Sequence, residues 1–188
     1  MKKNTIVQFV CFVTNLDLDQ FGVKWEHYSK AFMAGTDNMS LQRAQDTNNR
    51  HKYKYISQHE CSTENFRFDF MKERTSEHFP EHTAKVVQAG GFMPVQVQCR
   101  HVEDKDDVKI IAFIDGPETD FSFYHRQTYR HLNIYEAYYE SCAYSYIMEF
   151  IIQESEAAAL VKELKVRPGV EAVIYKECSV LTFENSFS

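Results

Sequence analysis

Glycine and proline are scarce in this sequence, whose 188 residues include 6 glycines and 4 prolines. This scarcity excludes a collagen-like repeat and leaves few turns that can be built on glycine. The chain also lacks a glycine-rich phosphate loop, a G-x-S-x-G nucleophile elbow and a cysteine–histidine cluster at metal-binding spacing. These absences remove the common sequence signatures of nucleotide binding, serine hydrolysis and zinc binding.

Dense runs of lysine or arginine are absent as well. Acidic residues outnumber basic ones by 27 to 21, which gives a formal net charge of -6 at pH 7. Such a charge repels phosphate backbones and anionic lipids. We therefore expect no nucleic-acid partner and no membrane partner. The hydrophobic fraction of 44% and the charged fraction of 26% are those of a soluble globular chain.

Closely spaced cysteines are also missing. The five cysteines form no Cys-x-x-Cys pair and lie at positions 11, 61, 99, 142 and 178. An odd and scattered set is typical of free thiols in a reducing compartment rather than of a disulfide framework. We therefore expect a cytoplasmic protein.

The beginning of the chain admits two interpretations. Lys2 and Lys3 precede an apolar run from Ile6 to Val13, an order that resembles a short signal peptide. Gln8 interrupts the run, however, and acidic residues follow it where a signal peptide needs a small-residue cleavage site. We therefore expect this segment to be the first strand of the fold.

Aromatic residues are abundant, and the 15 phenylalanines and 11 tyrosines predict a large aromatic core. In the first half of the chain, strand-like alternation and helical periodicity follow one another. Residues 35–50 are polar with little periodicity, so they are predicted to be a loop. The predicted strands cover residues 5–14, 51–61, 65–71 and 92–101, and the predicted helices begin at Asp17 and cover 75–89.

The acidic residues 103–107 are predicted to link a first unit, residues 1–102, to a second unit, residues 108–188. After this linker the order of elements repeats. Residues 133–140 stay open between a tyrosine-rich strand and an extension of the helix before them. The other strands are predicted at 108–114, 144–153 and 170–180, and the helices at 118–131 and 155–165.

Both halves read βαββαβ if residues 133–140 form a strand. They also share a similar junction before the last strand, Ala89-Gly90-Gly91-Phe92 in one half and Arg167-Pro168-Gly169-Val170 in the other. This order resembles the dimeric α+β barrel superfamily, in which two four-stranded sheets face each other. The resemblance implies an α+β fold of two tandem ferredoxin-like (βαββαβ) units that form a pseudo-dimeric barrel. Its members include cofactor-free monooxygenases and haem proteins, so the fold alone transfers no activity.

Polar side chains on one predicted strand could enter the space between the two sheets. Arg67 and Asp69 alternate with three phenylalanines within residues 65–71, so they share the polar face of that strand. Unpaired polar groups in such a space would each cost about 1–3 kcal/mol. We therefore expect Arg67 and Asp69 to face a ligand or to be satisfied by partners and water.

The predicted helix 118–131 carries a second set of candidate residues. His125 shares a helical face with Tyr129, while Tyr124 and His131 lie on an adjacent stripe. An apolar wall with a few polar groups is typical of small-molecule sites. The same stripe also suits ordinary packing, in which the polar tips of the rings reach water.

His78 to His82 spell H-x-x-E-H, a zinc-peptidase signature. That motif requires a continuous helix, and Pro80 disrupts one unless it lies at the first helical position. We therefore expect the helix to begin at Pro80, with His78 outside it, and no metal site.

Three functions of different classes remain open. Our main interpretation is a non-catalytic interaction or structural module. The alternatives are a small-molecule binding protein or cofactor-independent monooxygenase-like enzyme, and a haem protein with His125 or His131 as the ligand. The identity of any cofactor stays unknown. Fused halves could supply the strand pairing that single-unit relatives obtain by dimerising, so a monomer and a homodimer are both compatible with the sequence.

Overall fold

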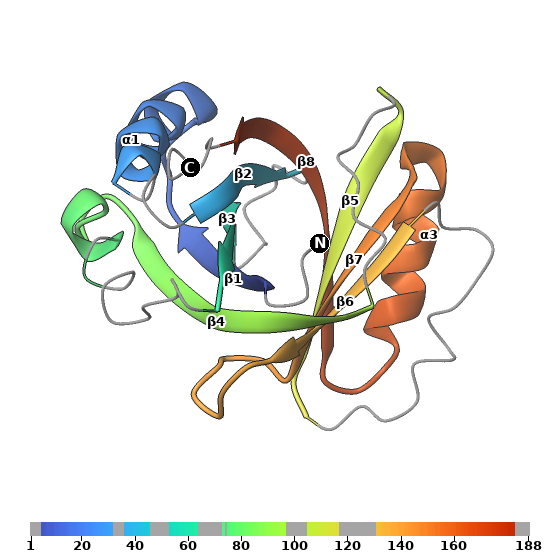
Figure 1. The fold of residues 1–188 in the computed structure, drawn as a ribbon. Helices are drawn as coiled ribbons and strands as arrows, with labels where there is room; N and C mark the ends of the chain where they lie inside the picture. Colours follow the sequence, from blue (N-terminus) through green and yellow to red (C-terminus); the bar gives the residue numbers. More distant parts are fainter. Residues whose placement is uncertain are drawn as a thin grey trace.

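Eight strands form one closed barrel in which every neighbouring pair is antiparallel. The computed structural model describes residues 5–31, 36–45, 53–63, 73, 75–96, 105–116 and 131–182. Figure 1 shows helices α1 and α3 outside the barrel, on opposite sides of it. The strands are β1 (Thr5–Val13), β2 (Thr36–Ala44), β3 (Tyr55–Ser62), β4 (Lys85–Gln96), β5 (Asp107–Ile114), β6 (His131–Ala137), β7 (Tyr146–Gln153) and β8 (Val170–Thr182), and the helices are α1 (Leu18–Lys30) and α3 (Glu154–Lys165).

The barrel order is β1-β3-β2-β8-β5-β7-β6-β4. Read from β4, this order places the fourth, first, third and second strands of each half of the chain side by side. Strands β2 and β8 join the two halves along one seam, and β4 and β6 join them along the other. No strand edge of the described barrel is left unpaired.

The prediction of two tandem ferredoxin-like units is wrong. The strands belong to a single closed sheet, because the two seams pair the strands that would otherwise be the edges of two separate sheets. Helices are also few in the described part of the chain, which contains α1, α3 and a short helical turn at 75–78. The predicted second helix of the first half, residues 75–89, is replaced from Lys85 onward by strand β4.

Two segments deviate from their predicted structure for identifiable reasons. Residues 36–44 form strand β2 rather than a loop, and their polar side chains face the barrel interior near other polar groups. In β4, Gly90 has a φ of 118° where the pairing with β1 shifts register, so the glycines mark a bulge and not a helix end. The loop between β6 and β7 carries Cys142 back against Gly90 and projects at the lower edge of Figure 1.

The first strand and first helix follow their predictions. Asp17 caps α1: its Oδ1 accepts the backbone N–H of Gln20 at 2.8 Å, and the side chain of Gln20 accepts the N–H of Asp17 at 3.3 Å. One face of α1 then buries Phe21, Trp25 and Tyr28 against the outer side of the barrel. Of the open segment 133–140, residues 133–137 form strand, since β6 runs from His131 to Ala137, and residues 138–140 lie in the loop that follows.

The barrel interior has its own apolar core. The buried side chains of this core come from all eight strands and from the loops beside them, so they meet at the barrel axis. Phe9 stacks edge-on against Phe92 and Tyr135 there, with ring centroids 5.7 and 5.5 Å apart. A separate core lies outside the barrel, where α3 buries three side chains against β5 and β7. Within the described residues, no helix has the length and hydropathy to cross a membrane.

Candidate functional site

Polar side chains gather at one end of the barrel interior. Residues two apart on a strand face the same side, so Lys109 lies on the inward face of β5 beside Ile111 and Phe113, which belong to the interior core. In the same way Glu149 follows Ile147 on β7, and Gln58 follows Ile56 on β3. The interior therefore changes from apolar to polar along each of these three strands.

A buried ion pair lies at the centre of this polar end. The Nζ of Lys109 is 2.9 Å from Oε2 of Glu149, and their side chains are 7% and 3% exposed. Burial by itself raises the pKa of Glu149, but the charge of Lys109 and hydrogen bonds from Tyr135, Lys109 and Gln58 outweigh it and hold the pKa below its ordinary value. Glu149 is therefore an ionised carboxylate at neutral pH.

Gln58 connects this pair to strands β2 and β8. Its Oε1 accepts hydrogen bonds from Lys109 Nζ at 3.1 Å, from Gln42 Nε2 at 3.2 Å and from Ser40 Oγ at 3.3 Å. The Nε2 of Gln42 also donates to Glu177 Oε2 at 3.2 Å. Five strands, β2, β3, β5, β7 and β8, are thus linked through side chains inside the barrel, and the positions of these groups are fixed by one another.

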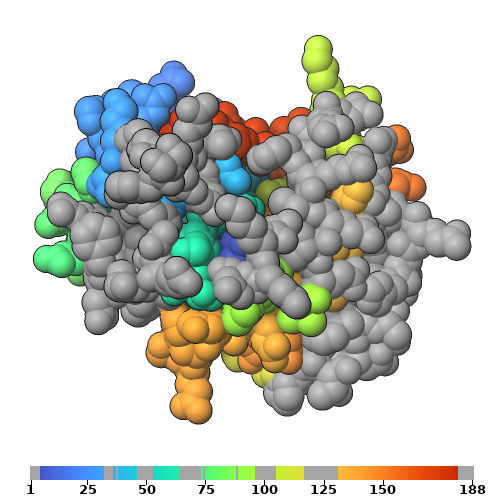
Figure 2. Space-filling view, in the orientation of Figure 1, coloured from blue at the N-terminus to red at the C-terminus, as the bar shows by residue number. Residues whose placement is uncertain are grey.

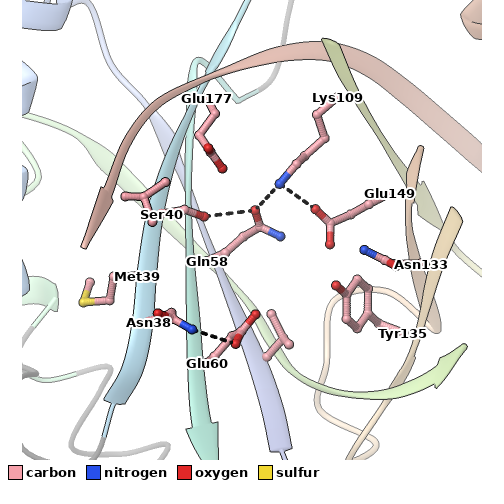
Figure 3. A pocket seen from close by; sticks show the side chains of 12 residues that line it. Asn38, Met39, Ser40, Gln58, Glu60, Lys109, Asn133, Tyr135, Glu149 and Glu177 are labelled. Carbon is pink, nitrogen blue, oxygen red and sulfur yellow. Dashed lines mark hydrogen bonds and ion pairs between the residues drawn. The ribbon is translucent and has the colours of Figure 1, made fainter. Parts of the chain in front are cut away.

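These groups surround a cavity of about 40 Å³. A volume of this size accommodates about three water-sized groups, at roughly 10–15 Å³ each. Figure 3 shows Lys109, Glu149 and Gln58 on its wall, with Glu60 bonded to Asn38 on another side. The lining residues are Val7, Asn38, Met39, Ser40, Gln58, Glu60, Lys109, Asn133, Tyr135, Glu149, Glu177 and Val180.

Of the candidate residues from the sequence, His131 is the one that the structure describes. It is half-buried and is the first residue of β6, on the strand face that also carries Asn133 and Tyr135. It therefore lies near the polar end of the interior, although it does not line the cavity. The other five candidates, Arg67, Asp69, Tyr124, His125 and Tyr129, lie outside the described residues.

The sequence analysis missed the cavity residues because they lie within segments whose pattern is that of ordinary core strands. A charged residue inside an apolar strand is a usable signal, since lysine and glutamate are almost never fully buried unless they are paired. Lys109 in DVKIIAFI and Glu149 in YIMEFIIQ both meet this description. Ser40 and Gln58 carry no comparable signal.

The H-x-x-E-H segment does not form the helix that was predicted for it. The helical turn at 75–78 ends before Pro80, and residues 81–83 form a turn, so His78 and His82 are not one helical turn apart on a common helix. Among the described residues, no group of three or more histidine, cysteine, aspartate or glutamate side chains could hold a metal ion.

A second polar cluster lies under helix α1, on the outer side of β3. Ser57 Oγ is 2.9 Å from His59 Nε2 and accepts a hydrogen bond from Trp25 Nε1 at 2.9 Å. Tyr28 Oη lies 3.3 Å from the same histidine nitrogen and 3.1 Å from Thr75 Oγ1. Burial lowers the pKa of His59 to about 3. All five side chains are buried, so this cluster holds α1 against the sheet and offers no path to a ligand.

The described part of the molecule also has a wider groove between α3 and β8. It shares no lining residue with the polar cavity or with the cluster under α1. It has a volume of about 350 Å³ and is lined by apolar and aliphatic groups with Gln45 and Lys165 at its rim. In the space-filling view of Figure 2, described atoms of β3 (teal) and β4 (green) lie at the surface of the face turned to the reader. The groove has no acid–base or metal-ligating constellation, so the polar cavity is the candidate site.

Known proteins resemble this chain in fold but not in sequence. No known protein family matches the sequence, and no curated protein matches it either. Solved structures do match, among them a protein from Lactobacillus acidophilus provisionally described as a monooxygenase, with 8% identity, a TM-score of 0.52 and coverage of 96% of this chain and 97% of that one.

Two further structures are similar over almost their whole length. One is provisionally described as a chlorite dismutase, with 12% identity, a TM-score of 0.58 and coverage of 94% and 96%. The other, from Fusobacterium nucleatum, is provisionally described as a monooxygenase, with 10% identity, a TM-score of 0.55 and coverage of 97% and 96%. At these identities the likeness concerns the fold alone.

Proposed function

We propose that this chain is a small-molecule enzyme of the monooxygenase-like kind, and that its ligand binds in the polar cavity of the barrel. The observation that carries the proposal is the buried Lys109–Glu149 pair beside a cavity. A buried ion pair is weak as a source of stability, because desolvation of both charges offsets their attraction. A pair of well-packed apolar side chains would stabilise the fold at least as much as this ion pair does. We therefore attribute the two charges to ligand recognition rather than to stability.

The reaction class rests on the structural neighbours, two of which are described as monooxygenases. Within the cavity, the hydroxyl of Tyr135 can exchange a proton with Glu149, to which it is hydrogen-bonded. The lowered pKa makes Glu149 a weak base, so its main task is to hold Lys109 and Tyr135 in position. These neighbours favour the enzyme over the interaction module that was our main interpretation.

A haem group does not fit this cavity. A porphyrin is far larger than a space of about 40 Å³, and the described lining contains no histidine or cysteine that could bind its iron. This cavity therefore provides no haem site.

A ligand screen followed by NMR tests the proposal. We expect small polar molecules to shift the backbone amide signals of β3, β5 and β7 near the cavity. Ser40→Leu places a larger side chain on the cavity wall and should abolish these shifts. Val13→Leu is the matched control, because Val13 is exposed at the end of β1 remote from Val7, which lines the cavity. Binding that survives Ser40→Leu would contradict the proposed site.

Oxygen consumption tests the reaction class separately. Without a cofactor, the electrons that reduce dioxygen have to come from the substrate, so a ligand from the screen that can be oxidised should cause the wild-type protein, but not Ser40→Leu, to consume dioxygen in an oxygen-electrode assay. Binding without oxygen consumption would leave a binding protein and remove the monooxygenase-like activity.

A further inference from the structure

The polar cavity has more negatively than positively charged side chains on its wall, and this imbalance describes its ligand. Its charged lining residues are three glutamates and one lysine. The ammonium of Lys109 is already engaged, because it contacts both Glu149 Oε2 and Gln58 Oε1. A ligand in this cavity therefore meets a positive charge that is already neutralised.

Glu60 supplies acceptor capacity on another side of the cavity. It is half-buried at the end of β3, and its Oε2 accepts one hydrogen bond, from Asn38 Nδ2 at 3.2 Å. An ionised carboxylate has room for about four hydrogen bonds on its two oxygens. Glu60 can therefore accept further donors from a molecule in the cavity.

Gln42 adds a buried acceptor beside the same cavity. Its Nε2 donates toward Ser40, Gln58 and Glu177, all of which line the cavity. Reversing the amide would turn its oxygen toward the carboxylate of Glu177 and the carbonyl of Gln58, so the orientation is fixed. Its Oε1 has no hydrogen-bond partner among the described residues, although Gln42 is fully buried. Gln42 is not among the residues that line the cavity, so it bears on the ligand only through the three lining side chains that its amide holds in place.

We propose that the ligand is a small primary amine, bound as its ammonium ion. An ammonium group supplies three N–H donors and no acceptor, and its charge complements Glu60. The volume of about 40 Å³ limits the ligand to a short carbon chain. A metal ion is a poorer fit, because the described carboxylates form no metal-ligating group. The inference rests on the proposed function, since it names the ligand class of that same cavity.

Three probes of similar size and different charge test the proposal on the full chain. Ethylammonium, ethanol and acetate are titrated against the wild-type protein, and the amide signals of β2, β3 and β5 are followed by NMR. We expect ethylammonium to bind at least about tenfold more tightly than ethanol or acetate, a difference of about 1.4 kcal/mol. This comparison needs no variant, so it stands even where a substitution impairs folding.

Glu60→Gln provides the second arm. The substitution keeps the size of the side chain and removes its charge, so it should weaken ethylammonium binding about tenfold or more and leave ethanol binding unchanged. Glu136→Gln is the control. Glu136 is exposed on the face of β6 opposite to that of Tyr135, which lines the cavity. Equal effects of the two substitutions would overturn the proposal.

The outcomes separate this inference from the proposed function. Tighter binding of acetate or ethanol at the cavity would overturn the amine and leave the small-molecule site standing. Absence of any ethylammonium shift at the cavity would also overturn the amine, while the ligand screen above would still decide whether the cavity is a binding site.

Discussion

His59 is fully buried between β3 and α1, where its ring contacts Ser57 and Tyr28. Burial lowers its pKa to about 3, whereas the ordinary value is about 6.5. The folded protein therefore keeps His59 neutral across a pH range in which the unfolded chain protonates it. This contribution to stability is complete above about pH 6.5 and is lost as the pH falls from there toward 3.

The histidine thus predicts a steep acid dependence of stability. Between pH 6.5 and 5, we expect the free energy of unfolding to fall by about 1.4 kcal/mol per pH unit because of His59. Urea unfolding of His59→Gln should show a flatter slope in this range, whatever its stability at neutral pH. His27→Gln is the control, because His27 is exposed on α1 and its loss should leave the slope unchanged. Equal slopes for wild type and His59→Gln would contradict the burial argument.

Individual residues of the site were only partly predictable. Lys109 and Glu149 are charged residues within apolar strands, so the sequence alone indicates them as candidate site residues. Their contact at 2.9 Å depends on the pairing of β5 with β7, and no local sequence pattern predicts which strands pair. His131 was predicted to lie on one stripe of a helix. It lies instead at the start of strand β6, near the polar end of the barrel.

Gly90 determines the shape of an element, because it sits at the bulge of β4 with a φ of 118°. Residues with a side chain rarely adopt this backbone conformation. A Cβ at position 90 would also lie 2.5 Å from the Sγ of Cys142. Strand β4 can therefore follow β1 and still receive the β6–β7 loop only with glycine at this point.

Gly90→Ala should destabilise the protein by more than about 1–2 kcal/mol, the cost of the backbone conformation alone. The control is the same change at Gly22, which lies inside α1 with no atom within 4 Å of its added Cβ. Gly22→Ala should stabilise the protein by about 0.5–1 kcal/mol, since alanine favours the helix interior. Urea unfolding measures both. In Cys142→Ala the clash is removed, so Gly90→Ala should cost less in that background but should not become neutral.

Elements with strong local signals were predicted well, and those shaped by the barrel were not. Strand β1 and helix α1 carry clear periodicity and a capping box, and they form as expected. Strand β2 was predicted to be a loop because its inward residues are polar, and they are polar because they face the cavity and its neighbours. The glycines of β4 mimic the end of a helix, although they serve a bulge.

The whole molecule is one barrel closed by two seams, β2 with β8 and β4 with β6. Every strand of the barrel therefore has two partners within the same chain. Strand pairing with a second copy is not needed to complete the sheet. The two halves were expected to form separate sheets that stack, and no local pattern in the sequence specifies that their edges join instead.

This closure predicts that folding does not depend on protein concentration. In urea unfolding, the midpoint should stay constant when the protein concentration is changed, because a single chain contains all the strand partners. Size-exclusion chromatography with light scattering provides an independent check against the chain mass of 22.1 kDa. A midpoint that rises with concentration would show that association with a second copy contributes to stability.

Strand β8, residues 170–182, emerges from the ribosome after the other seven strands of the barrel, and its place is between β2 and β5. Until it emerges, both neighbours expose N–H and C=O groups that other nascent chains can pair with. The growing polypeptide is therefore most prone to aggregation just before β8 emerges. Premature stop codons upstream of β8 should accordingly yield chains that chaperones retain or proteases remove.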